Sequence, residues 1–126
     1  MADVFALTGA WTLTPASGYP SLDPSVSTTI DETVQLIAKQ VGDLTLASDS
    51  PIAVDFGGVT NANVVVLKAI GGPCVLSVTW ANGTSQTIPF DSAFINISLT
   101  NPITAMTITR QPATLTYVRV MLGQQA

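Results

Sequence analysis

The sequence predicts an all-β protein, an antiparallel β-sandwich of about eight to nine strands that carries an extended N-terminal arm. Strand-forming residues dominate, and several stretches alternate between apolar and polar side chains, as half-buried strands do. Gly, Pro, Asn and Asp turn signals recur about every 8–12 residues, a spacing typical of sandwiches and barrels. The 126 residues are enough for one domain with a core of its own.

The first 28 residues differ from the rest, so we place an arm at residues 1–28 and the sandwich at residues 29–126. Asp3–Thr14 has the composition of an apolar strand, with Phe5 and Trp11 as its expected anchors. Thr14–Pro24 contains three prolines and a glycine and is therefore expected to be irregular. We expect the arm to pack on a neighbouring copy or on another subunit, although folding back onto its own sheet is equally compatible with the sequence.

Two segments after the arm carry strand signals. Thr28–Val41 alternates with strand period, yet Ile30, Val34, Ile37 and Val41 also fit a helix, and we favour a strand because no other segment is helical. Leu44–Ala47 and Ile52–Phe56 are expected to pair as a hairpin, turned through the residues between them.

The middle of the chain holds the clearest hairpin. Asn63–Ile70 is apolar on both faces, which indicates a central strand covered on both sides. Cys74–Trp80 alternates and is followed by Asn82-Gly83, which predicts a type I′ turn with both central residues at positive φ. The return strand is Thr84–Phe90.

Three further strands complete the prediction, separated by Asn-Pro and Gln-Pro breaks. They are Phe94–Leu99, Ile103–Arg110 and Thr114–Leu122. Alternation across these and the preceding strands predicts a buried core made of Leu76, Val78, Trp80, Ile88, Phe90, Ile97, Ile108, Val118 and Val120.

Charge argues against several classes of partner. Only 10% of the residues are charged, against about 25% in typical domains, and the net charge is −4. The cations are Lys39, Lys68, Arg110 and Arg119, too few and too scattered for nucleic acid or an acidic lipid surface. The N-terminus has no basic segment followed by a long apolar one, so we expect no signal peptide and folding in a reducing cytoplasm.

The sequence offers no catalytic constellation, and we expect no enzyme activity, cofactor or metal. It contains no histidine, which removes the histidine-based nucleophile arrangements and nearly all zinc sites. Cys74 lies in an apolar strand and is expected to be a buried, inert thiol. The adjacent carboxylates Asp31 and Glu32 would point to opposite faces of a strand and so could not flank one bond.

The last strand carries the best candidate contact residues. Tyr117, Arg119 and Met121 lie on the face opposite Val118 and Val120. Tyr, Arg and Met are favoured anchors of protein interfaces, so these residues are candidates for a subunit contact. Ordinary packing against a second sheet is the alternative, and the sequence favours it over a subunit contact.

Five stretches after Asp43 carry a resemblance to a known family. They are Val54–Val59, Val64–Ala69, Gln86–Asp91, Pro102–Arg110 and Val118–Gly123. These stretches resemble small virion proteins of tailed bacteriophages, in particular capsid decoration (cement) proteins, and the resemblance implies a jelly-roll-like sandwich without catalytic residues. The arm departs from many of these proteins, since it is rich in Pro and Ser rather than charged.

We therefore expect a non-enzymatic, homo-oligomeric virion protein, assembled in the host cytoplasm, that binds the major capsid protein and stabilises the mature capsid. The alternative is a receptor- or glycan-binding module of a tail fibre or baseplate. That alternative predicts more aromatic residues for stacking on sugars than the two Trp and two Tyr present.

Overall fold

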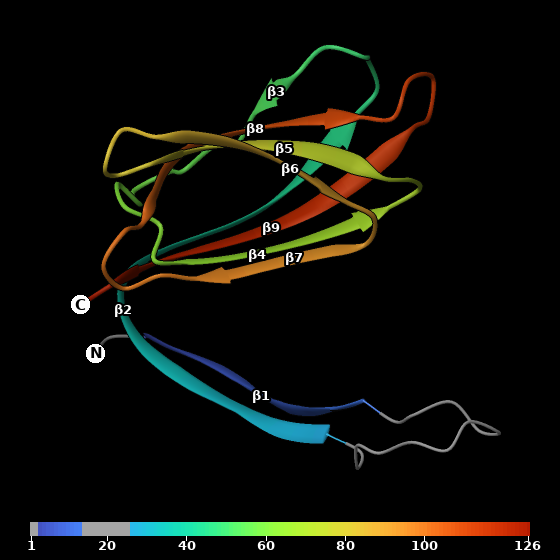
Figure 1. Cartoon of the computed structure of the whole chain (residues 1–126). Helices are drawn as coiled ribbons and strands as arrows, with labels where there is room; N and C mark the ends of the chain where they lie inside the picture. The colour runs from blue at the N-terminus through green and yellow to red at the C-terminus, as the bar shows by residue number, and fades with distance from the viewer. Residues whose placement is uncertain (1–2, 14–25) are drawn as a thin grey trace, which may run out of the picture.

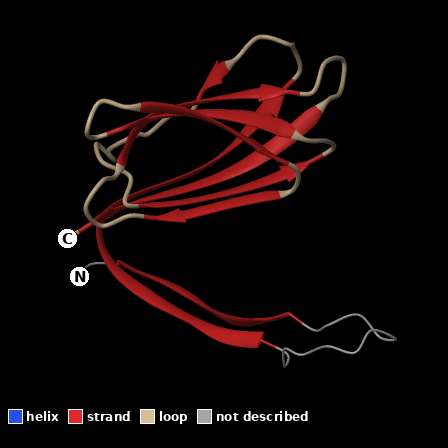
Figure 2. Cartoon of the chain, in the orientation of Figure 1, coloured by secondary structure: helices blue, strands red, loops and turns tan. Residues whose placement is uncertain are grey.

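The computed structural model describes residues 3–13 and 26–126, and the side chains of residues 3–8 and 33–126 among them. The predicted irregular segment Thr14–Pro24 lies outside the described residues. Every regular element of the described chain is a β-strand, and no helix occurs in it (Figures 1 and 2). The all-β prediction is therefore confirmed.

The strands form two antiparallel sheets stacked face to face (Figure 1). The five-stranded sheet has the order β1 (Asp3–Leu13), β2 (Val26–Leu46), β9 (Thr116–Gln125), β4 (Val64–Ile70) and β7 (Ala93–Ile97). The four-stranded sheet has the order β3 (Ile52–Ala53), β8 (Ile103–Arg110), β5 (Cys74–Trp80) and β6 (Ser85–Phe90).

The pairing of the sandwich strands is nested. β2 pairs with β9, β3 with β8, β4 with β7 and β5 with β6, all antiparallel. The first strand of this set thus pairs with the last, the second with the second to last, and so on inward. The chain therefore resembles one long hairpin that is folded over into two sheets. This is the jelly-roll arrangement of eight strands.

The core lies between the two sheets, where one side chain in two along each strand points inward. β5 shows the alternation most clearly, since Cys74, Leu76 and Val78 are buried and Val75 and Ser77 are exposed. Burying a side chain such as Leu76 stabilises the fold by about 1.5–3 kcal/mol. The buried set includes six of the nine predicted core residues, namely Leu76, Val78, Phe90, Ile108, Val118 and Val120.

The other three predicted core residues are only half-buried. Trp80 and Ile88 lie at the periphery of the core, Trp80 at the turn that joins β5 to β6 and Ile88 on β6, the edge strand of its sheet. Ile97 points away from the core and belongs to a second apolar cluster on the outside of the five-stranded sheet. Alternation predicted the face of Trp80 and Ile88, but it could not show that Trp80 lies at the end of the sandwich or that β6 is an edge strand.

β2 is a single 21-residue strand with two partners. Residues 26–36 pair with β1, whereas Ala38–Leu46 pairs with β9, and the register shifts between Leu36 and Ala38. β1 and residues 26–36 form a two-stranded ribbon, which leaves the sandwich at that shift and runs below the five-stranded sheet (Figure 1). The preference for a strand at Thr28–Val41 is confirmed, and this strand runs without a break through residues 28 and 29.

Two local predictions are wrong. Ile52–Ala53 pairs with β8 rather than with the end of β2, because the chain crosses from one sheet to the other at this point. The turn after β5 is not type I′, since Gly83 has φ +89° but Asn82 is not at positive φ. Gly83 N–H donates to the Trp80 carbonyl at 2.9 Å, which describes a type I turn closed by a glycine.

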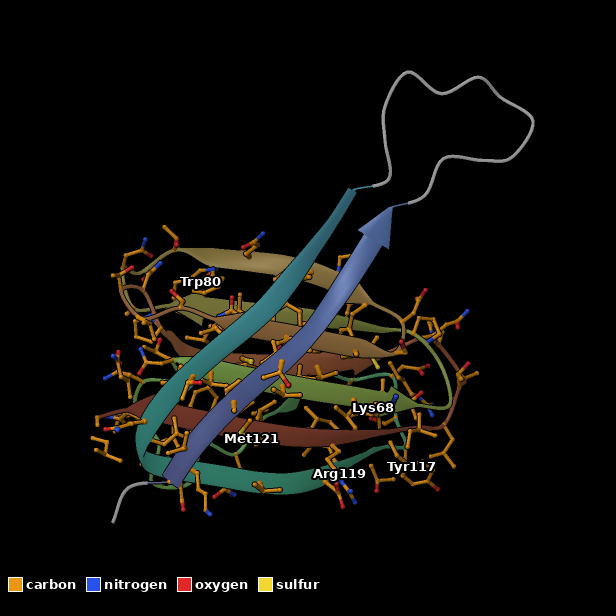
Figure 3. All side chains as sticks on the ribbon, turned by 90° about the horizontal axis from the view of Figure 1, so that it is seen from below. Lys68, Trp80, Tyr117, Arg119 and Met121 are labelled. Carbon is orange, nitrogen blue, oxygen red and sulfur yellow. The ribbon has the colours of Figure 1, made fainter. Side chains whose placement is uncertain are left out.

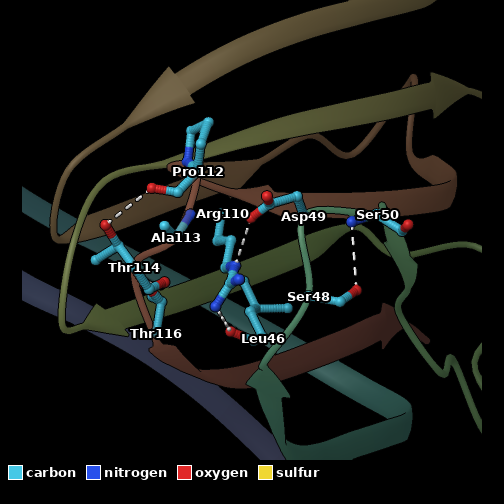
Figure 4. Close-up of polar contacts among 9 residues, drawn as sticks. All are labelled: Leu46, Ser48, Asp49, Ser50, Arg110, Pro112, Ala113, Thr114 and Thr116. Atoms are coloured by element: carbon cyan, nitrogen blue, oxygen red, sulfur yellow. Dashed lines mark hydrogen bonds and ion pairs between the residues drawn. The ribbon is translucent and has the colours of Figure 1, made fainter.

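The crossover after β2 is held by a carboxylate. Arg110 Nε and the backbone N–H of Ala113 both donate to Asp49 Oδ1 at 3.0 Å, and Arg110 Nη1 donates to the Leu46 carbonyl at 3.3 Å (Figure 4). Ala113 has φ +61°, an unusual conformation for a residue with a side chain. The hydrogen bond from the Ala113 N–H, followed by the one from Arg110, lowers the pKa of Asp49.

Candidate interaction surface

The candidate surface is the outer face of the five-stranded sheet, the side that points away from the four-stranded sheet. Strand register aligns its residues in three rows across β2, β9 and β4. Directly paired residues of an antiparallel sheet share a face. The rows are Thr45–Tyr117–Ile70, Asp43–Arg119–Lys68 and Val41–Met121–Val66, and the third row continues to Ile95 on β7.

This face exposes large apolar side chains. Val41 is 60% exposed, Ile70 62%, Ile95 48% and Tyr117 48%. Single exposed apolar residues are ordinary, but four on one face of one sheet indicate a contact surface. The neighbouring row is charged, so the face combines apolar and charged groups.

One end of the outer face is covered by the ribbon of the same chain. Val34, Leu36 and Val64 form a buried cluster, against which Phe5 and Met121 also pack. We call this cluster, completed by the half-buried Val66 and Ile97, the ribbon root. Lys39 Nζ and Asp3 Oδ2 form an ion pair at 2.8 Å at the start of β1.

The predicted interface residues fall into separate groups. Phe5 and Met121 belong to the ribbon root, so the structure brings these two together within one chain. Tyr117 and Arg119 lie on the open part of the face, beside Lys68 (Figure 3). The backbone of Trp11 pairs with Thr28 in the ribbon, and its side chain lies outside the described part of the structure.

The charged row has an ordered ion pair at one end. Arg119 Nε donates to Asp43 Oδ1 at 3.0 Å, and Nη2 donates to Oδ2 at 3.5 Å. The hydrogen bond with Arg119 lowers the pKa of Asp43, and the same hydrogen bond raises the pKa of Arg119. Both side chains are well exposed, so this pair orients Arg119 more than it stabilises the fold.

A shallow hollow of about 420 Å³ opens on the same part of the face. It is lined by Asp43, Lys68, Ile70, Tyr117, Val118 and Arg119. Its two cations and one carboxylate offer charge-assisted hydrogen bonds, while Tyr117 and Ile70 offer apolar contact. Groups of this kind suit binding better than bond-making chemistry.

No family model, curated protein or solved structure matches this chain.

The structure gives little support to a metal site, a reactive cysteine or a membrane-spanning helix in the described residues. Within the described ranges, no three Cys, Asp or Glu side chains gather in an arrangement that could hold a metal ion. Burial raises the pKa of the Cys74 thiol, which agrees with an unreactive core residue. The part of the chain that the structure describes has no helix able to cross a membrane.

Sequence reasoning found Tyr117, Arg119 and Met121 but missed the residues that flank them. Lys68 and Ile70 lie on the neighbouring strand, in a segment that was expected to be covered on both sides. The ribbon root does cover the Val64 end of that strand, but Ile70 at the other end is exposed. The single charge at Lys68 was the available signal that this end faces solvent.

Proposed function

We propose that this chain is a non-enzymatic structural protein that binds other protein subunits through the outer face of its five-stranded sheet. The observation that carries the proposal is the exposure of Val41, Ile70, Ile95 and Tyr117 on that one face. Tyr117 lies beside Arg119, and both residue types are enriched among the residues that dominate binding energy in interfaces.

The proposed setting is the virion of a tailed bacteriophage, with the major capsid protein as partner. Resemblance of the sequence to capsid decoration proteins supports this setting, and a jelly-roll sandwich is the fold that the resemblance implies. A protein that binds only the mature shell stabilises that state by mass action. The ribbon adds a second, elongated element with which a neighbouring copy or the shell could pair.

The absence of histidine from the sequence supports a role without catalysis. The most nucleophilic side chain, Cys74, is 2% exposed and has a raised pKa. A thiol in this state is mostly protonated at neutral pH and cannot reach a substrate.

The alternative function is a receptor- or glycan-binding module of a tail fibre or baseplate. The hollow beside Tyr117 and Arg119 favours it, since a ligand of modest size could sit there. Immunogold electron microscopy of purified particles of the encoding phage, with an antibody against this chain, separates the two. The proposal expects label over the capsid in many copies, whereas label at the tail tip supports the alternative and a particle without label refutes both.

A further inference from the structure

The charged row of the outer face has more positive than negative charge. Lys68 and Arg119 are direct partners on the adjacent strands β4 and β9. Like charges opposite one another destabilise a sheet. The carboxylate in this row, Asp43, bonds Arg119 and lies on β2, on the far side of Arg119 from Lys68.

The other three cations each form an ion pair with a carboxylate. Lys39 is paired with Asp3, Arg110 with Asp49 and Arg119 with Asp43. Among the described residues, no carboxylate forms an ion pair with Lys68. A carboxylate placed in the hollow beside Lys68 and Arg119 would balance the row.

Apolar side chains lie on both sides of the charged row. Tyr117 and Ile70 lie in the row on one side. The row on the other side contains Met121 and Val66, which are half-buried in the ribbon root, and the exposed Val41 and Ile95. Successive rows are two residues apart, about 6.8 Å along the strands. An extended peptide has the same spacing between alternate side chains, so its residues at positions i, i+2 and i+4 can meet three successive rows.

We propose that the outer face binds an extended segment of a partner protein that carries an Asp or Glu between two apolar residues, each two positions away. The carboxylate lies between Lys68 and Arg119, and the apolar residues contact the rows on either side. This inference names the chemistry of the partner and rests on the subunit-binding function proposed above.

Charge disfavours a second copy that docks through the same face. Two such faces would bring four cations and two carboxylates together, and unpaired charge in an interface is costly. The flanking rows favour protein over sugar, because most of their members are aliphatic or thioether side chains, namely Ile70, Val41, Met121, Val66 and Ile95.

The test uses the full chain and a blocked pentapeptide, Val-Thr-Glu-Thr-Val, with Val-Thr-Gln-Thr-Val as its matched control. Binding is followed by the amide NMR shifts of Lys68 and Arg119 during titration. We expect the Glu peptide to bind about ten-fold or more tightly than the Gln peptide, because it makes charge-assisted hydrogen bonds. Lys68→Gln should remove that preference, whereas Lys39→Gln, at another exposed cation, should keep it.

Equal affinity for the two peptides, an unchanged preference in Lys68→Gln, or shifts confined to another surface would each overturn the proposal. Tighter binding of a glucuronate disaccharide than of the Glu peptide would assign the hollow to an acidic glycan instead. Because Lys68 is exposed, its variant is expected to fold, and a thermal melt checks this. A positive peptide result with no label on virions would refute the virion setting and leave this site standing.

Discussion

Leu36 lies directly against the α-carbon of Gly123 in the neighbouring strand. A Cβ at Gly123 would be 2.8 Å from Leu36 Cδ2 and 2.9 Å from Leu36 Cδ1, closer than such atoms can approach. This contact falls where the register of β2 shifts and the ribbon separates from β9. Because Gly123 has no side chain, Leu36 and the rest of the ribbon root can pack against the outer face.

The first prediction concerns this contact. Gly123→Ala should displace Leu36 and loosen the ribbon root, at a cost of about 1–3 kcal/mol for overpacking. Hydrogen exchange should rise at residues 3–8 and 33–36 while the strands of the core stay protected. Gly42→Ala is the matched control, because a Cβ there meets nothing within 4 Å. Equal effects of the two variants would show that the Leu36 contact does not hold the ribbon.

The second prediction concerns pH. The pKa of Asp49 is lowered in the folded protein, chiefly by the Ala113 N–H and then by Arg110, so its ionised form favours folding. This contribution is present above the pKa of the unfolded chain, about 3.9, and is lost as the pH falls through the lower folded pKa.

Asp49→Asn should therefore reduce the loss of stability between neutral pH and pH 3, measured by urea unfolding. Asp91→Asn serves as the comparison, since no ion pair of Asp91 occurs among the described residues. The effect should be small, because the Asp49 side chain is 60% exposed. An Asp49→Asn protein with the same acid sensitivity as the parent would contradict this account.

The third prediction concerns Cys74. The buried thiol has a raised pKa, so it should react with a thiol reagent at pH 8 far more slowly than a free cysteine. Unfolding in guanidinium should restore the full rate. Fast modification of the native protein would show that Cys74 is accessible, and would contradict its assignment as an unreactive core residue.

Much of the fold follows from local pattern. The alternation in Cys74–Trp80 and Ile103–Arg110 predicted β5 and β8 with their observed bounds, because each strand has one face in the core. Partner choice is not local, and so the pairing of Ile52 with β8 was missed. The half-burial of Trp80 likewise depends on where the opposite sheet ends.

For the outer face of the five-stranded sheet, the sequence predicted which side chains of one strand share a face, but not which strands lie next to each other. The side chains of Tyr117, Arg119 and Met121 could be assigned to one face from period two alone. The packing of Phe5 in the ribbon root depends on the register shift near Leu36. No residue pattern in the sequence indicates this shift. The position of Lys68 opposite Arg119 depends on long-range strand register.

Binding of the purified chain to particles of the proposed phage that lack this protein tests the proposed subunit-binding function most directly. Ile70→Asp places a charge on the outer face of the five-stranded sheet, and Val75→Asp places the same charge on the exposed face of the other sheet. Co-sedimentation with the particles is measured for the parent chain and both variants, after thermal melts show that each folds. We predict that Val75→Asp binds like the parent and that Ile70→Asp does not bind. Binding by Ile70→Asp at the parental level, or loss of binding only in Val75→Asp, would contradict the proposed function.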